Sequence, residues 1–202
     1  ITVLKKPALS DFTYTLPGDT VYDATAKEAT VAVKGGITGM GSYKILYNGS
    51  EIAPVDAGTY TVTLQVAKSD TYAAATFNLG TFTIAKATPT ITASDLTVTK
   101  NTTQALSASI SNGEALTYQS SNPSIAAVDA NGAVTGVAEG TAIITIYYSG
   151  SENYNSMTKN VTVTVTAKNL VAVTFAAKGD QTYKPEGYAL GEQFNTATTT
   201  AT

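Results

Sequence analysis

The chain has 202 residues, a formal net charge of −3 and only 13 % charged residues, while 43 % of its residues are hydrophobic. Cys, His and Trp are absent, and every basic residue is Lys. These absences exclude nucleophile systems that need His or Cys, imidazole and thiolate metal sites, haem ligation through His, and disulfides. At roughly 150 residues per domain, the length allows one or two folding units.

The charge and hydropathy patterns argue against two kinds of partner. The longest basic run is Lys5-Lys6, whereas nucleic-acid binding needs a clustered positive surface. No stretch approaches the ~20 apolar residues of a membrane span. We therefore expect no nucleic-acid partner and no membrane span. The chain begins at Ile1 inside a predicted strand, so we expect an excised fragment whose lack of a targeting signal says nothing about destination.

Apolar residues recur with period two along almost the whole chain. Residues 59–66 alternate Thr or Gln with Tyr, Val and Leu, and residues 160–166 alternate Asn or Thr with Val. Successive side chains of a strand point to opposite faces, so each segment has one dry face and one wet face. No segment of helical length shows the i, i+3, i+4, i+7 spacing of an amphipathic helix. The sequence predicts an all-β fold.

Asn-Gly dipeptides mark positions where strands are expected to reverse, because both residues tolerate the positive φ of tight turns. Asn112-Gly113 is one such turn. Frequent turns between short strands are typical of a sandwich or barrel. The two predicted hairpins are 43–47 with 50–53 around Asn48-Gly49, and 124–128 with 133–135 around Asn131-Gly132.

The chain contains an internal repeat, because segment 58–86 aligns without a gap on segment 140–168. Each copy consists of a Gly-led strand, a polar loop that ends in Tyr72 or Tyr154, and a closing strand. Such a repeat favours two related units over one large domain. The identical pairs include Gly58 with Gly140, Ser69 with Ser151, Tyr72 with Tyr154, Asn78 with Asn160 and Lys86 with Lys168.

The two closing strands differ in phase. The second copy buries Val at 161, 163 and 165, whereas in the first copy Leu79 is followed by Phe82 and Ile84. An extra residue reverses the faces that follow it, so we predict a β-bulge at Gly80. If there is no bulge, Phe82 faces outward.

The connection between the two units is short. Only a few residues separate Ile84 from Ile91, and they include Pro89. Pro fixes its own φ and biases Thr88 toward extended geometry. We therefore expect a stiff connection between two sandwiches that are arranged end to end.

Residues 89–166 resemble a bacterial immunoglobulin-like domain of group 2, the kind stacked in intimin- and invasin-type surface proteins. The resemblance rests on Leu96-Thr97-Val98 and on the run from Ser120 to Thr145, which includes Ser121-Asn122-Pro123 and Asn131-Gly132. Residues 7–86 are similar to a related class of bacterial Ig-like modules through 22–27 and 56–62. These motifs describe turns and a core strand, so the resemblance implies a fold without an active site.

We therefore predict an all-β chain of tandem Ig-like β-sandwiches arranged end to end. The predicted domains are 1–86 and 87–168, and 169–202 is the start of a truncated third module or a set of appended strands.

Several groups of residues invite a chemical interpretation that the sequence does not favour. The glycine-rich segment 35–41 has no predicted helix after it, so it does not fit a phosphate loop. A glycosidase needs two carboxyl groups roughly 5–10 Å apart across a cleft, and the acidic residues are instead scattered near turns. A weak calcium site could use Asp129 with Asn131, or Glu152 with Asn153 and Asn155, but Asx turn chemistry explains both sets. The scattered acidic residues are Asp19, Asp23, Asp56, Asp70, Asp129, Glu139 and Glu152.

Tyrosines are the best candidates for a sugar-binding surface. Adjacent strand residues face opposite ways, and the phase of the strand buries Tyr148 and exposes Tyr147. Tyr183 and Tyr188 form a second candidate pair. The repeated Tyr72 and Tyr154 are better interpreted as corner residues that bury the ring and anchor the hydroxyl.

A Lys–Asn isopeptide crosslink is known in some bacterial surface Ig-like domains. Asn78 and Asn160 recur on the two closing strands, but the strand phase turns Asn160 outward and away from a buried partner.

We therefore predict a protein without catalytic, cofactor-binding or metal-binding residues and without a cofactor. The expected function is that of non-catalytic spacer modules of a bacterial cell-surface or secreted protein, which present another domain. Its expected partners are neighbouring domains of the same polypeptide, with a host or glycan ligand as a further possibility, and the expected state is a monomer. The alternative function is an adhesin or carbohydrate-binding module.

Overall fold

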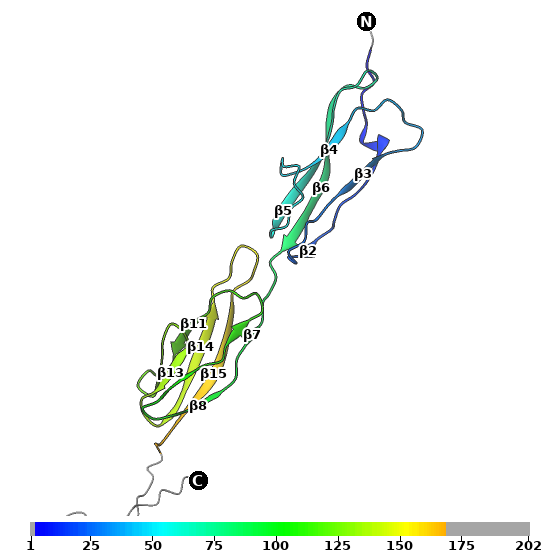
Figure 1. The fold of residues 1–202 in the computed structure, drawn as a ribbon. Helices are drawn as coiled ribbons and strands as arrows, with labels where there is room; N and C mark the ends of the chain where they lie inside the picture. Colours follow the sequence, from blue (N-terminus) through cyan, green and yellow to red (C-terminus); the bar gives the residue numbers. More distant parts are fainter. Residues whose placement is uncertain (1–2, 169–202) are drawn as a thin grey trace, which may run out of the picture. The chain divides into compact units, whose positions relative to one another are not determined.

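The computed structural model describes residues 3–168, which fold almost entirely into strands and loops (Figure 1). The described part of the chain contains one short 3-10 turn, Leu9–Asp11, and no α-helix. The all-β prediction is confirmed. Within residues 3–168 there is accordingly no helix with the length and apolarity needed to cross a membrane.

The first sandwich pairs a two-stranded sheet with a four-stranded sheet. The small sheet contains β1 (Phe12–Thr15) and β3 (Thr30–Val33), which are antiparallel. The larger sheet has the order β2-β6-β5-β4, in which β2 runs parallel to β6 and the other pairs are antiparallel. Its strands are β2 (Thr20–Val21), β4 (Tyr43–Tyr47), β5 (Gly58–Val66) and β6 (Ala75–Ala85).

The second sandwich repeats this arrangement with additional short strands. Its main sheet has the order β11-β14-β15-β8, and β8 runs parallel to β15 as β2 does to β6. The opposing layer contains a β12-β13-β9 sheet and the pair β10-β7. The strands are β7 (Ile91–Thr92), β8 (Leu96–Thr99), β9 (Thr103–Ala105), β10 (Ser109–Ile110), β11 (Thr117–Ser120), β12 (Ala126–Val128), β13 (Ala133–Gly136), β14 (Gly140–Tyr148) and β15 (Met157–Thr166).

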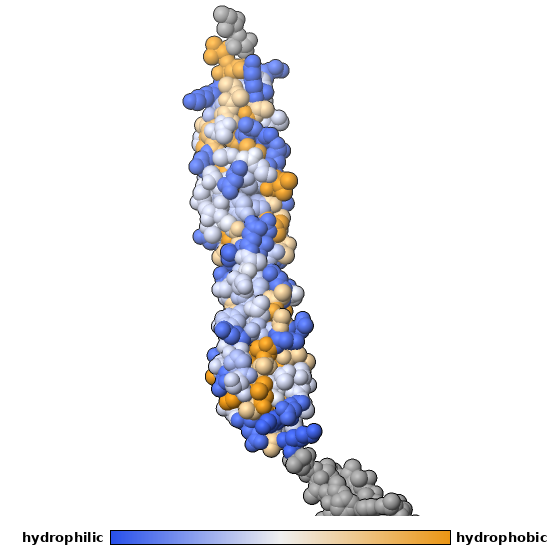
Figure 2. Space-filling model, turned by 90° about the vertical axis from the view of Figure 1, so that its left-hand side faces the viewer, coloured by the Kyte–Doolittle hydropathy of each residue, from blue (hydrophilic) through white to orange (hydrophobic). Residues whose placement is uncertain are grey.

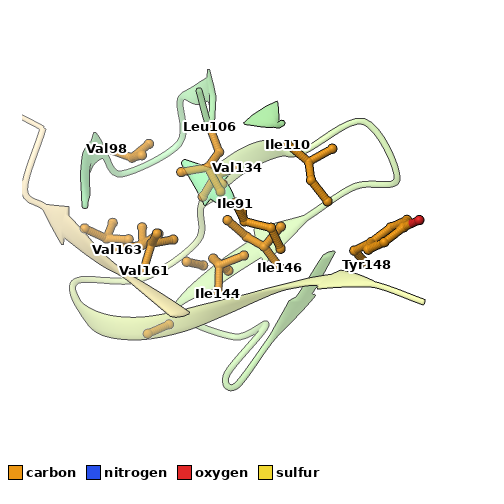
Figure 3. Packing of buried hydrophobic residues seen from close by; sticks show 13 residues of the cluster. Ile91, Val98, Leu106, Ile110, Val134, Ile144, Ile146, Tyr148, Val161 and Val163 are labelled. Atoms are coloured by element: carbon orange, nitrogen blue, oxygen red, sulfur yellow. The ribbon is translucent and has the colours of Figure 1, made fainter. Parts of the chain in front are cut away.

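Each sandwich encloses its own hydrophobic core, and both cores lie within one compact unit of the chain. Figure 3 shows the second core, in which Ile144 and Ile146 of β14 point toward Leu106 and Val134 of the opposing layer. These four side chains are buried. The first core contains Phe12, Ala29, Tyr47, Val62, Leu64, Val66, Leu79, Phe82 and Ile84.

The structure gives the sequence repeat a physical meaning. β5 begins at Gly58 and ends at Val66, and β14 begins and ends at the aligned residues Gly140 and Tyr148. As predicted, the residues of the dry face at 62, 64 and 66 and at 161, 163 and 165 are buried. The β5–β6 and β14–β15 hairpins have the same pairing register next to the loop that joins their strands, where Val66 pairs with Ala75 and Tyr148 with Met157. At the far end of the strands the two registers differ by one residue.

A β-bulge in β6 causes this difference. Val62 pairs with Gly80 and Thr63 pairs with Asn78, so Leu79 has no residue opposite it. Gly80 takes φ +130°, a conformation that a residue with a side chain rarely adopts. Because the extra residue reverses the faces, Leu79 and Phe82 both reach the core. The predicted bulge at Gly80 is confirmed.

The three Asn-Gly turns are present, but one predicted hairpin is wrong. At Asn48-Gly49 both residues have positive φ and Tyr47 exchanges backbone hydrogen bonds with Ser50. The return strand predicted at 50–53 does not form, because β4 pairs along its length with β5 instead. The Asn48 side chain fixes the turn to β5, donating to the Thr59 carbonyl and accepting from the Thr61 N–H.

At Asn131-Gly132 the predicted hairpin forms between β12 and β13. Only Gly132 has positive φ there. The backbone N–H groups of Gly132 and Asp129 close the turn, donating to the carbonyls of Asp129 and Ala133 respectively. Asn112-Gly113 also reverses the chain, with the Gly113 N–H bonded to the Ile110 carbonyl, although β10 and β11 lie in different sheets.

Candidate functional site at the junction of the sandwiches

A group of hydrogen bonds between residues far apart in the sequence lies at the connection between the first and the second sandwich. We call this region the junction and define it as the linker 85–88 with the residues of the two sandwiches that contact it or one another there. From the first sandwich these are Tyr22, Asp56 and Ala57, and from the second they are Ser151, Asn153, Tyr154 and Asn155.

The linker is paired with the second sandwich through its backbone. The Ala87 N–H donates to the Asn153 carbonyl at 2.9 Å, and the Ala87 carbonyl accepts from the Asn155 N–H at 2.8 Å. This forms a parallel bridge between Ala87 and Tyr154. The Asn155 side chain adds a bond to the Thr88 hydroxyl at 3.0 Å. The linker therefore behaves as part of the second sandwich and not as a free tether.

Asn153 connects the second sandwich directly to the first. Its Oδ1 accepts the Ala57 N–H at 2.7 Å, and its Nδ2 donates to Asp56 Oδ1 at 2.9 Å. An amide side chain suits this position because it offers an acceptor and a donor side by side. One side chain thus satisfies a backbone group and a carboxylate of the other sandwich.

Two further contacts lie beside Asn153. The rings of Tyr22 and Tyr154 meet edge to face, with their centroids 5.4 Å apart and their planes at 80°, a geometry that aromatic rings favour. The ammonium group of Lys86 donates to the Ser151 carbonyl at 2.8 Å. The junction therefore combines apolar, neutral polar and charged contacts.

The turn that receives Asn153 is fixed to the first core. The Tyr60 hydroxyl donates to the Asp56 carbonyl at 2.8 Å, and the Tyr60 ring stacks on Phe82 with 5.6 Å between centroids. Burial, together with the negative charges of Asp56 and Glu152, raises the pKa of Tyr60.

The same backbone pairing occurs where the chain enters the first sandwich. Lys5 forms a parallel bridge with Tyr72, and its N–H and carbonyl bond to Thr71 and Ala73 at 2.8 Å each. Lys5 and Ala87 are equivalent by the alignment that relates Tyr72 to Tyr154. In both copies of the repeat, therefore, the segment that enters the sandwich pairs with the loop that ends in Tyr72 or Tyr154, which we call the tyrosine loop.

The tyrosine loops differ in part from their predicted role. Tyr72 is buried, as predicted, whereas Tyr154 is half-buried and its ring contacts Tyr22. Neither hydroxyl makes a hydrogen bond to another residue within the described range. The loops are fixed by backbone bonds instead, in which Ser69 and Ser151 donate to the carbonyls of Tyr72 and Tyr154.

The residues considered for calcium are engaged with the protein itself. Asp129 accepts the backbone N–H groups of Asn131 and Ala133, which is an Asx turn. The amide groups of Asn153 and Asn155 make the junction bonds described above. Within residues 3–168 no group of three or more acidic residues is close enough to hold a metal ion.

The other carboxylates lie apart and serve local structure. Asp19 accepts the Thr83 N–H at 2.7 Å. Asp23 forms an ion pair with Lys27 at 2.6 Å and also accepts from Thr25. The bond from Lys27, and then those from Thr25, lower the pKa of Asp23 to about 2. These contacts are those of stabilised turns and not of a facing pair of carboxylates.

The remaining predicted positions are placed as follows. Segment 35–41 is a loop that leads into strand β4. Tyr148 is buried, while Tyr147 is half-buried with its hydroxyl bonded to Gln119 Oε1 at 3.1 Å. Asn160 is exposed, as the strand phase predicted. Tyr183 and Tyr188 lie outside the described residues.

The surface of the first sandwich also carries a shallow groove of about 580 Å³ across β4, β5 and β6. Tyr43, which is 39 % exposed, lines this groove together with Lys44, Gln65 and Thr76. The Tyr43 ring meets Phe12 edge to face, and its hydroxyl donates to the Val31 carbonyl. On the face shown in Figure 2, hydrophobic residues occur in small separate groups among polar ones.

Two family models match successive parts of the chain. Residues 13–88 match the MBG domain, and residues 102–149 match the immunoglobulin-like domain of intimin. The two matches, one in each sandwich, confirm the predicted resemblance to tandem bacterial immunoglobulin-like domains. The intimin match includes the whole run from Ser120 to Thr145 that carries the resemblance in the sequence. A search of curated proteins found no match to these tandem domains.

Several solved structures resemble the chain at low sequence identity. Domains 4 and 5 of the S-layer protein SbsC are 19 % identical over 76 % of this chain and 96 % of that one, with a TM-score of 0.34. A 282-residue fragment of intimin in complex with the intimin-binding domain of its receptor Tir is 20 % identical over 76 % and 63 %, with a TM-score of 0.31. Fibronectin(III)-like modules of Clostridium thermocellum CbhA are 13 % identical over 82 % and 99 %, with a TM-score of 0.32.

Proposed function

We propose that the two Ig-like domains are non-catalytic structural modules of a bacterial cell-surface or secreted protein. They act as a spacer that presents a neighbouring domain of the same polypeptide. The observation that carries this proposal is the junction, where the polar groups of Asn153, Asp56 and the linker are paired with one another by hydrogen bonds. A spacer needs such contacts between modules, whereas an enzyme needs polar groups left free to meet a substrate.

The domain limits that fit this proposal are 1–86 and 87–168. The first core ends at Ile84 and the second begins at Ile91, so the linker lies between two separate interiors. The chemistry of the surface also suits a spacer: the acidic groups described above form turns, and only 13 % of the residues are charged. The match to an intimin domain supports an extracellular or cell-surface location.

A binding assay with the purified chain tests the absence of a ligand. We expect no saturable binding to a panel of immobilised glycans or to extracellular-matrix proteins. Saturable binding that a soluble ligand competes away would contradict the spacer proposal.

The groove beside Tyr43 favours one second candidate, a carbohydrate-binding module. An exposed aromatic ring beside amide, ammonium and hydroxyl groups offers the apolar and polar contacts that a sugar needs. In that case Tyr43→Ala removes glycan binding, while Tyr14→Ala, which removes another exposed tyrosine of the same sandwich, leaves it unchanged. Equal binding by the two variants would exclude the groove as the site.

A further inference from the structure

Contacts between consecutive domains of one chain are usually small and allow relative motion. The junction differs from this expectation in two respects. The linker is paired through its backbone with the Tyr154 loop, and one side chain of that loop reaches across to the other sandwich.

We propose that Asn153 is the residue that locks the two sandwiches into one mechanical unit. Its amide group is the direct polar connection between the second sandwich and the Asp56-Ala57 turn of the first, with 2.7 Å and 2.9 Å bonds. The inference deepens the proposed spacer function, because a locked junction transmits the position of one module to the next.

A series of contacts connects the first core to the linker. On the first side, Phe82 supports Tyr60, and the Tyr60 hydroxyl holds the carbonyl of Asp56. On the second side, the Asn153 carbonyl accepts from Ala87 in the linker. The backbone of the Asp56-Ala57 turn is therefore held on one side and the backbone of Asn153 on the other, and the Asn153 side chain joins these two held segments.

The aligned position in the first copy shows what the lock requires. Thr71 stands where the second copy has Asn153, and both residues use their carbonyl to accept the N–H of the entering chain. A threonine hydroxyl cannot offer a separate acceptor and donor in the planar arrangement of an amide. Backbone entry is thus shared by both copies, and the side-chain lock is specific to Asn153.

The absence of Cys from the chain makes the test direct, because two introduced cysteines are then the only labelling sites. Spin labels at Thr76→Cys and Gln104→Cys, which are exposed residues of the first and second sandwich, report the distance between the two bodies. The intact chain should give one narrow distance distribution by pulsed electron spin resonance. Asn153→Ala should broaden it, and Asn160→Ala should not, because Asn160 is an exposed residue of β15 away from the junction.

An exchange of partners separates the lock from a general loss of folding. Asn153→Asp keeps the acceptor for the Ala57 N–H but sets a second carboxylate against Asp56, so the distribution should broaden. Adding Asp56→Asn returns a donor opposite the new carboxylate, and the double variant should recover the narrow distribution. Circular dichroism of each variant verifies that both sandwiches remain folded.

Three outcomes would overturn the proposal: a broad distribution for the intact chain, an unchanged distribution for Asn153→Ala, or no recovery in the double variant. Glycan binding by the chain would contradict the spacer function while leaving this result intact, so the two failures are distinguishable.

Discussion

The backbone of Ala87 pairs with that of Tyr154 in the way that the backbone of Lys5 pairs with that of Tyr72. Both entering residues donate to the residue before the tyrosine and accept from the residue after it. The chain therefore meets each sandwich at a fixed residue, whatever the entering side chain.

This relationship predicts the effect of removing the N–H of Ala87. Ala87→Pro loses the bond to the Asn153 carbonyl, which is worth about 0.5–1.5 kcal/mol. Ala87→Ser keeps the N–H and should leave the free energy of unfolding unchanged. Urea unfolding of both variants measures the difference. A proline variant as stable as the serine variant would show that the bridge contributes nothing.

Two buried tyrosines predict opposite results for the same substitution. The Tyr47 hydroxyl accepts the Ala29 N–H at 2.7 Å, so Tyr47→Phe leaves a buried donor unpaired at a cost of about 1–3 kcal/mol. The Tyr148 hydroxyl is buried and has no partner among residues 3–168. Tyr148→Phe should therefore be neutral or stabilising. Thermal and urea unfolding compare them, and a clear loss of stability in Tyr148→Phe would contradict this account of its hydroxyl.

The bulge in β6 makes a prediction about glycine. At Gly80, φ is +130° and an added Cβ would lie 3.0 Å from Leu16 Cδ1, so Gly80→Ala should destabilise the first sandwich by about 1–3 kcal/mol. Gly35 has room for a Cβ and no positive φ. Gly35→Ala is the matched control and should have little effect. Equal free energies of unfolding for these two variants would be inconsistent with a strained bulge.

The Asp23–Lys27 pair predicts a titration shift. Lys27→Met removes the main cause of the low pKa, which should rise from about 2 toward the ordinary value of 3.8. Because the pKa is lower in the folded chain, the contribution of Asp23 to stability is present above pH 3.8 and is lost as the pH falls toward 2. An NMR titration of the Asp23 carboxyl carbon measures both values. An unchanged pKa in Lys27→Met would assign the shift to Thr25.

The sequence predicted those features that depend on residues near each other in the chain. The Val residues at 161, 163 and 165 show their buried face by alternation alone. The change of phase between Leu79 and Phe82 even located the bulge, since only an extra residue buries both. The hairpin predicted with 50–53 was wrong because the pairing depends on residues farther along the chain. An Asn-Gly turn indicates where a strand ends but not which strand pairs with it, and β4 pairs with β5.

The candidate site depended on residues far apart in the chain. Asp56 lies near one end of the first sandwich and Asn153 in a loop of the second, and no periodicity relates them. In the sequence, Glu152, Asn153 and Asn155 form a polar group that is typical of turn residues or weak calcium ligands. The repeat was the available signal, because it places Asn153 opposite Thr71 in an otherwise similar loop. The partner across the junction required three-dimensional contacts.

Replacement of residues 1–168 in the full-length protein tests the proposed spacer function most directly. The substitute should be an unrelated pair of tandem Ig-like domains that shares none of the junction or groove residues. If the account is correct, the neighbouring domain remains displayed and active at the cell surface. Loss of its activity despite normal display of the substituted protein would show that these two domains contribute more than distance.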